Sequence, residues 1–128
     1  MNYGYTREVD HPFDRAVERV TEELGKEGFG VLTSIDVKDT LKKKLDEDRR
    51  PYVILGACNP HFAHQALQME EDLGLLLPCN AVVYENEKGH TVIGAIDTHA
   101  MLGLVGNDAL DPVADEVNAR LRRAIDAV

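Results

Sequence analysis

The sequence lacks the features of several specialised classes of protein. It has only two cysteines in 128 residues, which excludes a small secreted scaffold held together by several disulfides. No apolar run approaches the roughly 20 residues that a membrane-spanning helix needs. The first residues, 1–5, have neither the basic flank nor the apolar stretch of a signal peptide. We therefore expect a cytoplasmic protein with no membrane association.

Basic residues are also scarce. The chain has 14 Lys and Arg against 23 Asp and Glu, a formal net charge of −9. Nucleic acids and anionic membranes need clustered positive charge, so this balance disfavours both as partners. The most basic segment, residues 38–50, interleaves its lysines and arginines with acidic residues and is typical of a solvated face. We expect an acidic protein that binds no nucleic acid.

The composition and length of the chain are otherwise typical of a globular domain. Hydrophobic residues make up 44% and charged residues 29% of the chain, and 128 residues are enough to bury a core. No internal repeat, low-complexity run or linker divides the sequence. Residues 1–128 are therefore predicted to form a single domain.

Alternation and helical spacing of apolar residues predict five strands and about five helices. The strands are expected at 2–9, 29–36, 52–57, 79–86 and 91–97. Helices are expected from a cap at Asp10 to Gly25, after a cap at Asp36, over 60–72, over 98–104, and from a cap at Asp111. The loop 86–90 is typical of a hairpin, which requires antiparallel neighbours. We predict an α+β fold: a two-layer sandwich of a mainly antiparallel five-stranded sheet with helices packed on it.

Both cysteines lie in distinctive motifs, Cys58-Asn59-Pro60 and Pro78-Cys79-Asn80. Cys58 precedes a predicted helix N-terminus, where free N–H groups and the helix dipole can stabilise a thiolate. Asn59 and Asn80 can donate hydrogen bonds to a polar ligand, although Asn59 is also explained as a helix cap. The alternative interpretation is two small apolar cysteines packed in the core, because free cysteine is among the most buried residue types.

Two histidines follow Cys58 on the predicted helix. His61 and His64 are spaced i, i+3 and lie opposite the apolar face, so they could hold one ion at the surface or serve as a base for Cys58. The spacing of Cys58 and Cys79 is not that of paired structural zinc ligands, so no metal site is predicted. Soft-metal binding through Cys58 and Cys79, with a histidine joining them, remains an alternative hypothesis.

Four stretches of sequence together resemble one family. They are Gly28–Leu32 with Ile35–Val37, Arg50–Tyr52 with Leu55–Pro60, Leu75–Asn80 with Val82–Glu85, and Gly106-Asn107 before the last helix. They resemble the motifs of the bacterial and archaeal domain-of-unknown-function 302 family over nearly the whole chain. The resemblance implies a compact two-layer α/β fold that tends to form homodimers. It implies no reaction, since that family has none assigned.

These observations favour a small homodimeric binding or accessory module with a small-molecule ligand near the two cysteine motifs. The candidate site residues are Cys58, Asn59, His61, His64, Cys79 and Asn80. No complete catalytic set and no cofactor motif accompanies them. Two alternatives stay open: a thiol-dependent redox enzyme that uses Cys58, and a soft-metal protein that uses Cys58 and Cys79.

Overall fold

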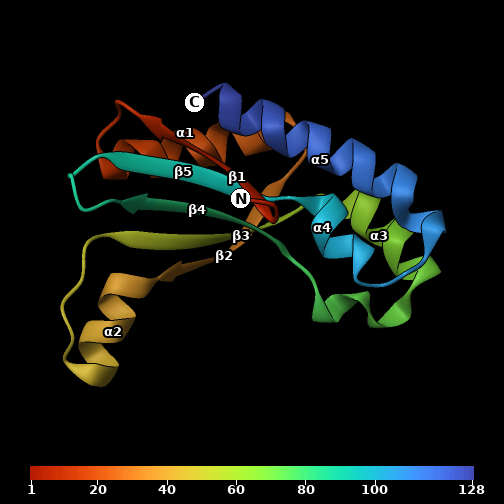
Figure 1. Ribbon diagram of the computed structural model, residues 1–128, viewed down its shortest axis with the longest axis horizontal. Helices are drawn as coiled ribbons and strands as arrows, with labels where there is room; N and C mark the ends of the chain where they lie inside the picture. The colour runs from red at the N-terminus through yellow and green to blue at the C-terminus, as the bar shows by residue number, and fades with distance from the viewer.

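The computed structural model describes residues 1–128, which form one five-stranded sheet and five α-helices (Figure 1). The strands are β1 (Gly4–Val9), β2 (Gly30–Asp36), β3 (Tyr52–Cys58), β4 (Cys79–Glu85) and β5 (Thr91–Ile96). The helices are α1 (Phe13–Lys26), α2 (Val37–Leu45), α3 (Pro60–Met69), α4 (Thr98–Gly103) and α5 (Asp111–Asp126). Short 3₁₀ segments cover Glu71–Leu75 and Asp108–Leu110.

Every neighbouring pair of strands in the sheet is antiparallel, and the strand order is β1-β5-β4-β3-β2. The predicted hairpin joins β4 to β5. Its turn is held by the Asn86 side chain, whose Oδ1 accepts hydrogen bonds from the amides of Lys88 and His90. The first strand lies beside the last, with Tyr5 opposite Ala95. The predicted α+β class and antiparallel sheet are confirmed.

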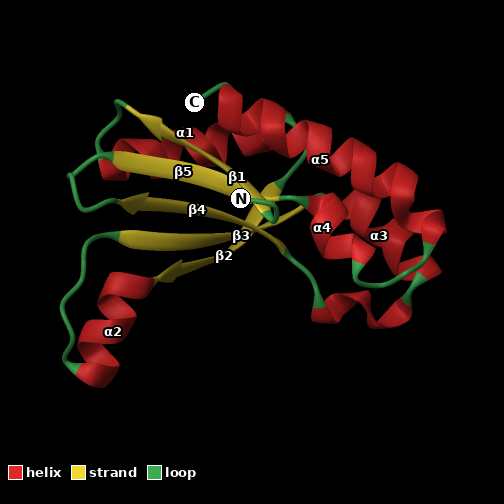
Figure 2. Ribbon diagram, viewed as in Figure 1, coloured by secondary structure: helices red, strands yellow, loops and turns green.

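The second layer is formed mainly by α1 and α5, which pack together against one face of the sheet (Figure 2). Apolar side chains spaced by about four residues supply the contact, as the sequence pattern predicts. They include Ala16, Val20 and Leu24 of α1, and Val117, Leu121 and Ile125 of α5, all buried. These side chains belong to one hydrophobic cluster of 23 residues. None of the helices combines the length and the apolar character needed to cross a membrane.

Two of the predicted helix caps are wrong. The N-cap of α1 is Pro12, which makes no side-chain capping bond, so Asp10 does not cap this helix. In α5, Asp111 is already the first helical residue, because the 3₁₀ segment runs directly into the helix through Leu110 in a helical conformation. A side-chain cap needs an extended residue at this point, and here the chain never becomes extended.

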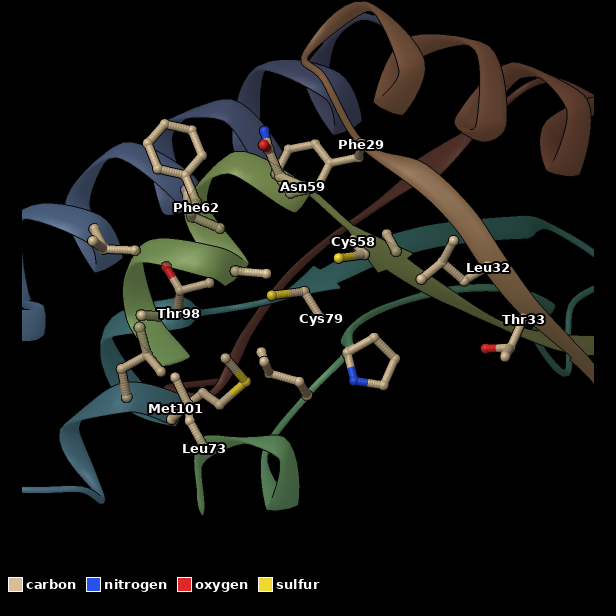
Figure 3. A pocket seen from close by; sticks show the side chains of 18 residues that line it. Phe29, Leu32, Thr33, Cys58, Asn59, Phe62, Leu73, Cys79, Thr98 and Met101 are labelled. Carbon is tan, nitrogen blue, oxygen red and sulfur yellow. The ribbon is translucent and has the colours of Figure 1, made fainter. Parts of the chain in front are cut away.

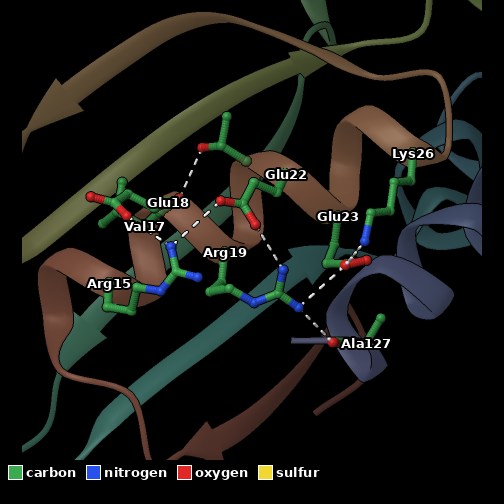
Figure 4. Close-up of polar contacts among 9 residues, drawn as sticks. Arg15, Val17, Glu18, Arg19, Glu22, Glu23, Lys26 and Ala127 are labelled. Carbon is green, nitrogen blue, oxygen red and sulfur yellow. Dashed lines mark hydrogen bonds and ion pairs between the residues drawn. The ribbon is translucent and has the colours of Figure 1, made fainter.

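The outward side of α1 carries a network of ion pairs that also holds the end of the chain (Figure 4). Glu23 is nearly buried and accepts hydrogen bonds from Lys26 at 2.9 Å and from Arg19 at 3.3 Å. Arg19 donates a further hydrogen bond to the carbonyl oxygen of Ala127 at 3.0 Å. The network therefore joins α1 to the residues that follow α5, which stabilises the layer of helices.

The remaining helices lie at opposite ends of the sheet. In Figure 1, α3 and α4 gather where β3 ends and β4 begins, and α2 projects from the other end, after β2. Asp36 caps α2 as predicted, by accepting a hydrogen bond from the amide of Asp39 at 2.8 Å. No residue of α2 is buried.

Candidate functional site

A cavity of about 330 Å³ lies between the end of the sheet and the α3–α4 group of helices (Figure 3). Its walls come from residues around β2, from the end of β3 and the start of β4, and from α3, α4 and α5. The larger side chains that line it are Phe29, Leu32, Phe62, Leu73, Leu77, Met101, Leu102, Val113 and Val117. Elements from both halves of the sequence therefore build this one site.

The register of β3 and β4 brings the two cysteines to this cavity. Ala57 pairs with Cys79 across the two strands, so the backbone of Cys58, the next residue of β3, is adjacent to that of Cys79. Alternation along β3 starts the Cys58 side chain on the face opposite Cys79, and both side chains reach the cavity because it lies at the end of the sheet. Both cysteines line the cavity and neither is in a disulfide. The structure thus joins the two predicted motifs at a single site.

The two thiols differ in exposure. Cys58 is half-buried, whereas Cys79 is buried, with 8% of its surface exposed. Burial, together with a smaller contribution from the charge of Cys58, raises the pKa of the Cys79 thiol to about 11. Both effects disfavour the charged form. Cys79 is therefore a neutral thiol at physiological pH.

Asn59 follows Cys58 directly and lies at the cavity wall, but its amide is already engaged. The residue occupies the N-cap position of α3 without making a side-chain capping bond. Instead, its Nδ2 donates a hydrogen bond to the carbonyl oxygen of Glu27 at 3.3 Å. The same oxygen accepts a hydrogen bond from Arg120 Nη1 at 3.0 Å. Asn59 therefore braces the turn before α3 against the end of α1.

Three of the predicted site residues do not line the cavity. His61 and His64 are exposed on α3, as their helical spacing predicts, while Phe62, Ala63 and Ala66 of the same helix face inward. Asn80 is also exposed; it follows Cys79 on β4, so its side chain points to the other face of the sheet. No group of three His, Cys, Asp or Glu side chains that could hold a metal ion is present.

A β-bulge shapes the mouth of the cavity. On β2, Val31 pairs with Ala57 and Thr33 with Gly56, so Leu32 has no partner on β3. A bulge of this kind redirects a side chain, and here Leu32 lines the cavity while 70% of it is exposed. Glycine is required at position 56, opposite Thr33, because a Cβ there would clash with Thr33 Oγ1.

Sequence reasoning missed the part of the cavity that α4 supplies. Thr98 is fully buried; its Oγ1 donates a hydrogen bond to the carbonyl oxygen of Ala114 at 2.7 Å, and its amide donates to Asn118 Oδ1 at 3.1 Å. These two hydrogen bonds attach α4 to α5. Held in this place, α4 directs the Met101 side chain into the cavity. The apolar periodicity of a six-residue helix is too short to indicate which neighbour it faces.

The lining is almost entirely apolar. Thr33, Asn59 and Thr98 are its only residues with a hydroxyl or amide side chain, and no charged side chain lines it. The guanidinium group of Arg120 lies over the ring of the lining residue Phe62, 5.2 Å from its centroid, but Arg120 itself does not line the cavity. Such a site can exclude water and hold an uncharged molecule, but it offers no evident acid, base or anion-binding group.

Comparison with known proteins agrees with the overall fold. No curated protein sequence matches the chain. Residues 5–128 match the family described as "Domain of unknown function DUF302". The chain is also similar to a solved structure, the "uncharacterized conserved protein DUF302 from Bacillus stearothermophilus", with a TM-score of 0.92 and 34% sequence identity. That similarity covers 99% of this chain and 98% of the other. The chain therefore belongs to the DUF302 family of domains of unknown function.

Proposed function

We propose that this protein is a cytoplasmic binding module that takes a small, uncharged, apolar molecule into the cavity beside Cys58 and Cys79. The observation that carries the proposal is a cavity of about 330 Å³ with no charged lining residue. Small-molecule sites are typically apolar hollows of about 300–1,000 Å³ with few polar groups. The cavity lies at the small end of that range, which favours a compact ligand.

The chemistry of the lining supports an apolar ligand. The hydroxyl of Thr98 and the amide nitrogen of Asn59 already have hydrogen-bond partners within the protein. An apolar space left empty forfeits dispersion contacts along its walls. Apolar cavities of about 150 Å³ engineered into other proteins stay dry and bind benzene or xenon. A ligand here would restore contacts without having to displace tightly held water.

A fluorescence titration with the uncharged probe N-phenyl-1-naphthylamine tests the proposal. We expect saturable binding of one probe per chain. Ala63→Leu, which extends a cavity-lining side chain of α3, should weaken binding about tenfold or more, since overfilling packed space costs about 1–3 kcal/mol. Ala119→Leu, on the exposed side of α5, is the matched control and should bind as the parent does. Absence of saturable binding, or equal binding by both variants, would contradict the proposal.

The module is also proposed to be a homodimer, assembled through α2 and the edge strand β2. Leu32, Ile35 and Leu45 are 70%, 48% and 65% exposed on these elements. A nine-residue helix with no buried residue is marginal in water by itself, and β2 leaves one edge of the sheet unpaired. A second copy fits this surface, because an antiparallel pair of identical edge strands is self-complementary.

Thiol chemistry on the bound molecule is the second candidate function. It is favoured by the half-buried thiol of Cys58, which opens into the cavity beside Cys79. The exposed histidines of α3 do not line that cavity, so a base for Cys58 is lacking there. The test is the rate of Cys58 alkylation against pH in a Cys79→Ala background. A midpoint well below about pH 8.5, the ordinary thiol value, would favour this function, and a midpoint at or above it would exclude an activated nucleophile.

A further inference from the structure

Sulfur atoms are concentrated in the cavity. The chain has two cysteines and three methionines. Both cysteines and Met101 line the cavity, whereas Met1 is 72% and Met69 is 39% exposed. Every sulfur-containing side chain that is not exposed therefore faces the same space.

The three sulfur-bearing side chains come from three separate elements. Cys58 ends β3, Cys79 begins β4, and Met101 lies on α4. Figure 3 shows the two thiol ends turned into the cavity, with the Met101 side chain entering from the side of α4. The backbones of the two cysteines are adjacent, because Cys79 pairs with Ala57, the residue before Cys58. The sheet and the hydrogen-bonded α4 hold this arrangement in place.

We propose that Cys58, Cys79 and Met101 form a binding site for Cu(I). Thiolate and thioether sulfur are soft ligands, which select Cu(I) over harder ions. No histidine, aspartate or glutamate lines the cavity, so the site lacks the imidazole and carboxylate ligands that most divalent metal ions use. Met101 therefore takes the place of the histidine that sequence spacing suggested as a third ligand.

Binding exchanges protons for the metal ion. Each cysteine releases its proton to solvent as its sulfur–copper bond forms, while the Met101 sulfur contributes a lone pair and releases nothing. Burial opposes the thiolate form of Cys79, and the positive charge of the bound ion offsets that penalty. Because the ion competes with protons, the affinity must fall as the pH is lowered. This site goes beyond the proposed uptake of an apolar molecule and does not depend on it.

The experiment is an anaerobic titration of the full chain with Cu(I) against the chromogenic chelator bicinchoninate. We expect one Cu(I) per chain, with X-ray absorption showing sulfur as the only ligand type. Cys58→Ser and Cys79→Ser should each weaken binding about 100-fold or more, since loss of a group that merely orients a ligand already costs 10–100-fold. Met101→Leu, which nearly conserves volume, should weaken it about tenfold, and the exposed Met69→Leu is the matched control.

Several results would overturn the proposal of a Cu(I) site. They are failure to retain Cu(I) against the chelator, nitrogen or oxygen ligands in the absorption spectrum, or equal affinity in Met101→Leu and Met69→Leu. Circular dichroism and thermal unfolding of each variant separate ligand loss from misfolding, and Cys79→Ala provides a second variant if Cys79→Ser does not fold. Probe binding without Cu(I) binding would refute this site alone, whereas Cu(I) binding without probe binding would refute only the proposed apolar ligand.

Discussion

The side-chain amide of Asn59 donates a hydrogen bond to the backbone carbonyl of Glu27, at 3.3 Å and across 32 residues of sequence. This contact joins the cavity wall to the end of α1. It also gives Asn59, a residue whose type suggested ligand binding, a structural role.

Removing that amide should destabilise the protein. Asn59 is 9% exposed, so Asn59→Ala loses a largely buried hydrogen bond and should lower the free energy of unfolding by about 1–2 kcal/mol. Asn80→Ala, on the exposed start of β4, is the matched control and should change it by less than about 0.5 kcal/mol. Urea unfolding monitored by circular dichroism provides the measurement. Equal stability of the two variants would show that the Asn59 contact is unimportant.

Gly56 should tolerate no side chain. A Cβ at this position would lie 2.2 Å from Thr33 Oγ1 and 2.9 Å from Pro78 Cγ, so Gly56→Ala should destabilise the fold by about 1–3 kcal/mol. Adding Thr33→Ala removes the closer of these atoms and should restore part of the loss. Gly74→Ala, where a Cβ meets nothing within 4 Å, is the control for a glycine replacement. A Gly56→Ala protein as stable as the Gly74→Ala protein would contradict the described packing of β2 on β3.

Alkaline pH should remove the stability that the buried Cys79 thiol contributes. Its pKa is raised by burial from 9.0 to about 11 in the folded chain, so the folded state keeps the proton where the unfolded state releases it. The contribution is complete below about pH 9 and is lost as the pH rises through about 11. Between pH 8 and 11 the parent should lose about 2 kcal/mol more than Cys79→Ala, in which this group is absent. Identical pH profiles in urea unfolding would argue against a buried neutral thiol.

The α2–β2 surface should govern assembly. Light scattering coupled to size-exclusion chromatography should give the parent twice the chain mass of 14.2 kDa. Leu45→Asp places a charge on the exposed apolar end of α2 and should yield the monomer, because burying an unpaired charge at an interface is strongly unfavourable. Leu75→Asp, at an exposed leucine distant from α2 in sequence, is the control and should remain dimeric. A parent that elutes with the mass of one chain would refute the dimer.

Local patterns predicted the elements well because each depends on neighbouring residues. The nearly continuous apolar run over residues 52–57 indicates a strand whatever lies beside it, and the 86–90 loop carries its own turn signal. The order of the strands in the sheet, by contrast, could not be predicted from local patterns. Placing Tyr5 beside Ala95 requires knowledge of contacts between residues about 90 positions apart, and no periodicity contains that information.

Only part of the candidate site could be predicted, because local patterns reveal residue types but not the tertiary contacts that bring residues together. Cys58 and Cys79 stand out by residue type, and adjacent antiparallel strands bring them together. Met101 and Thr98 resemble ordinary core residues in the sequence. They reach the cavity because two hydrogen bonds from Thr98 attach α4 to α5, a tertiary relationship that helical spacing does not express.

The central claim is that the cavity beside Cys58 and Cys79 takes up an apolar molecule. Its most direct test is a crystal structure of the protein under xenon pressure, since xenon enters dry apolar cavities. We predict anomalous density between α3, α4 and the ends of β3 and β4, within contact distance of Phe62 and Met101. A cavity filled instead by ordered, hydrogen-bonded water, with xenon bound only at the surface, would contradict the account.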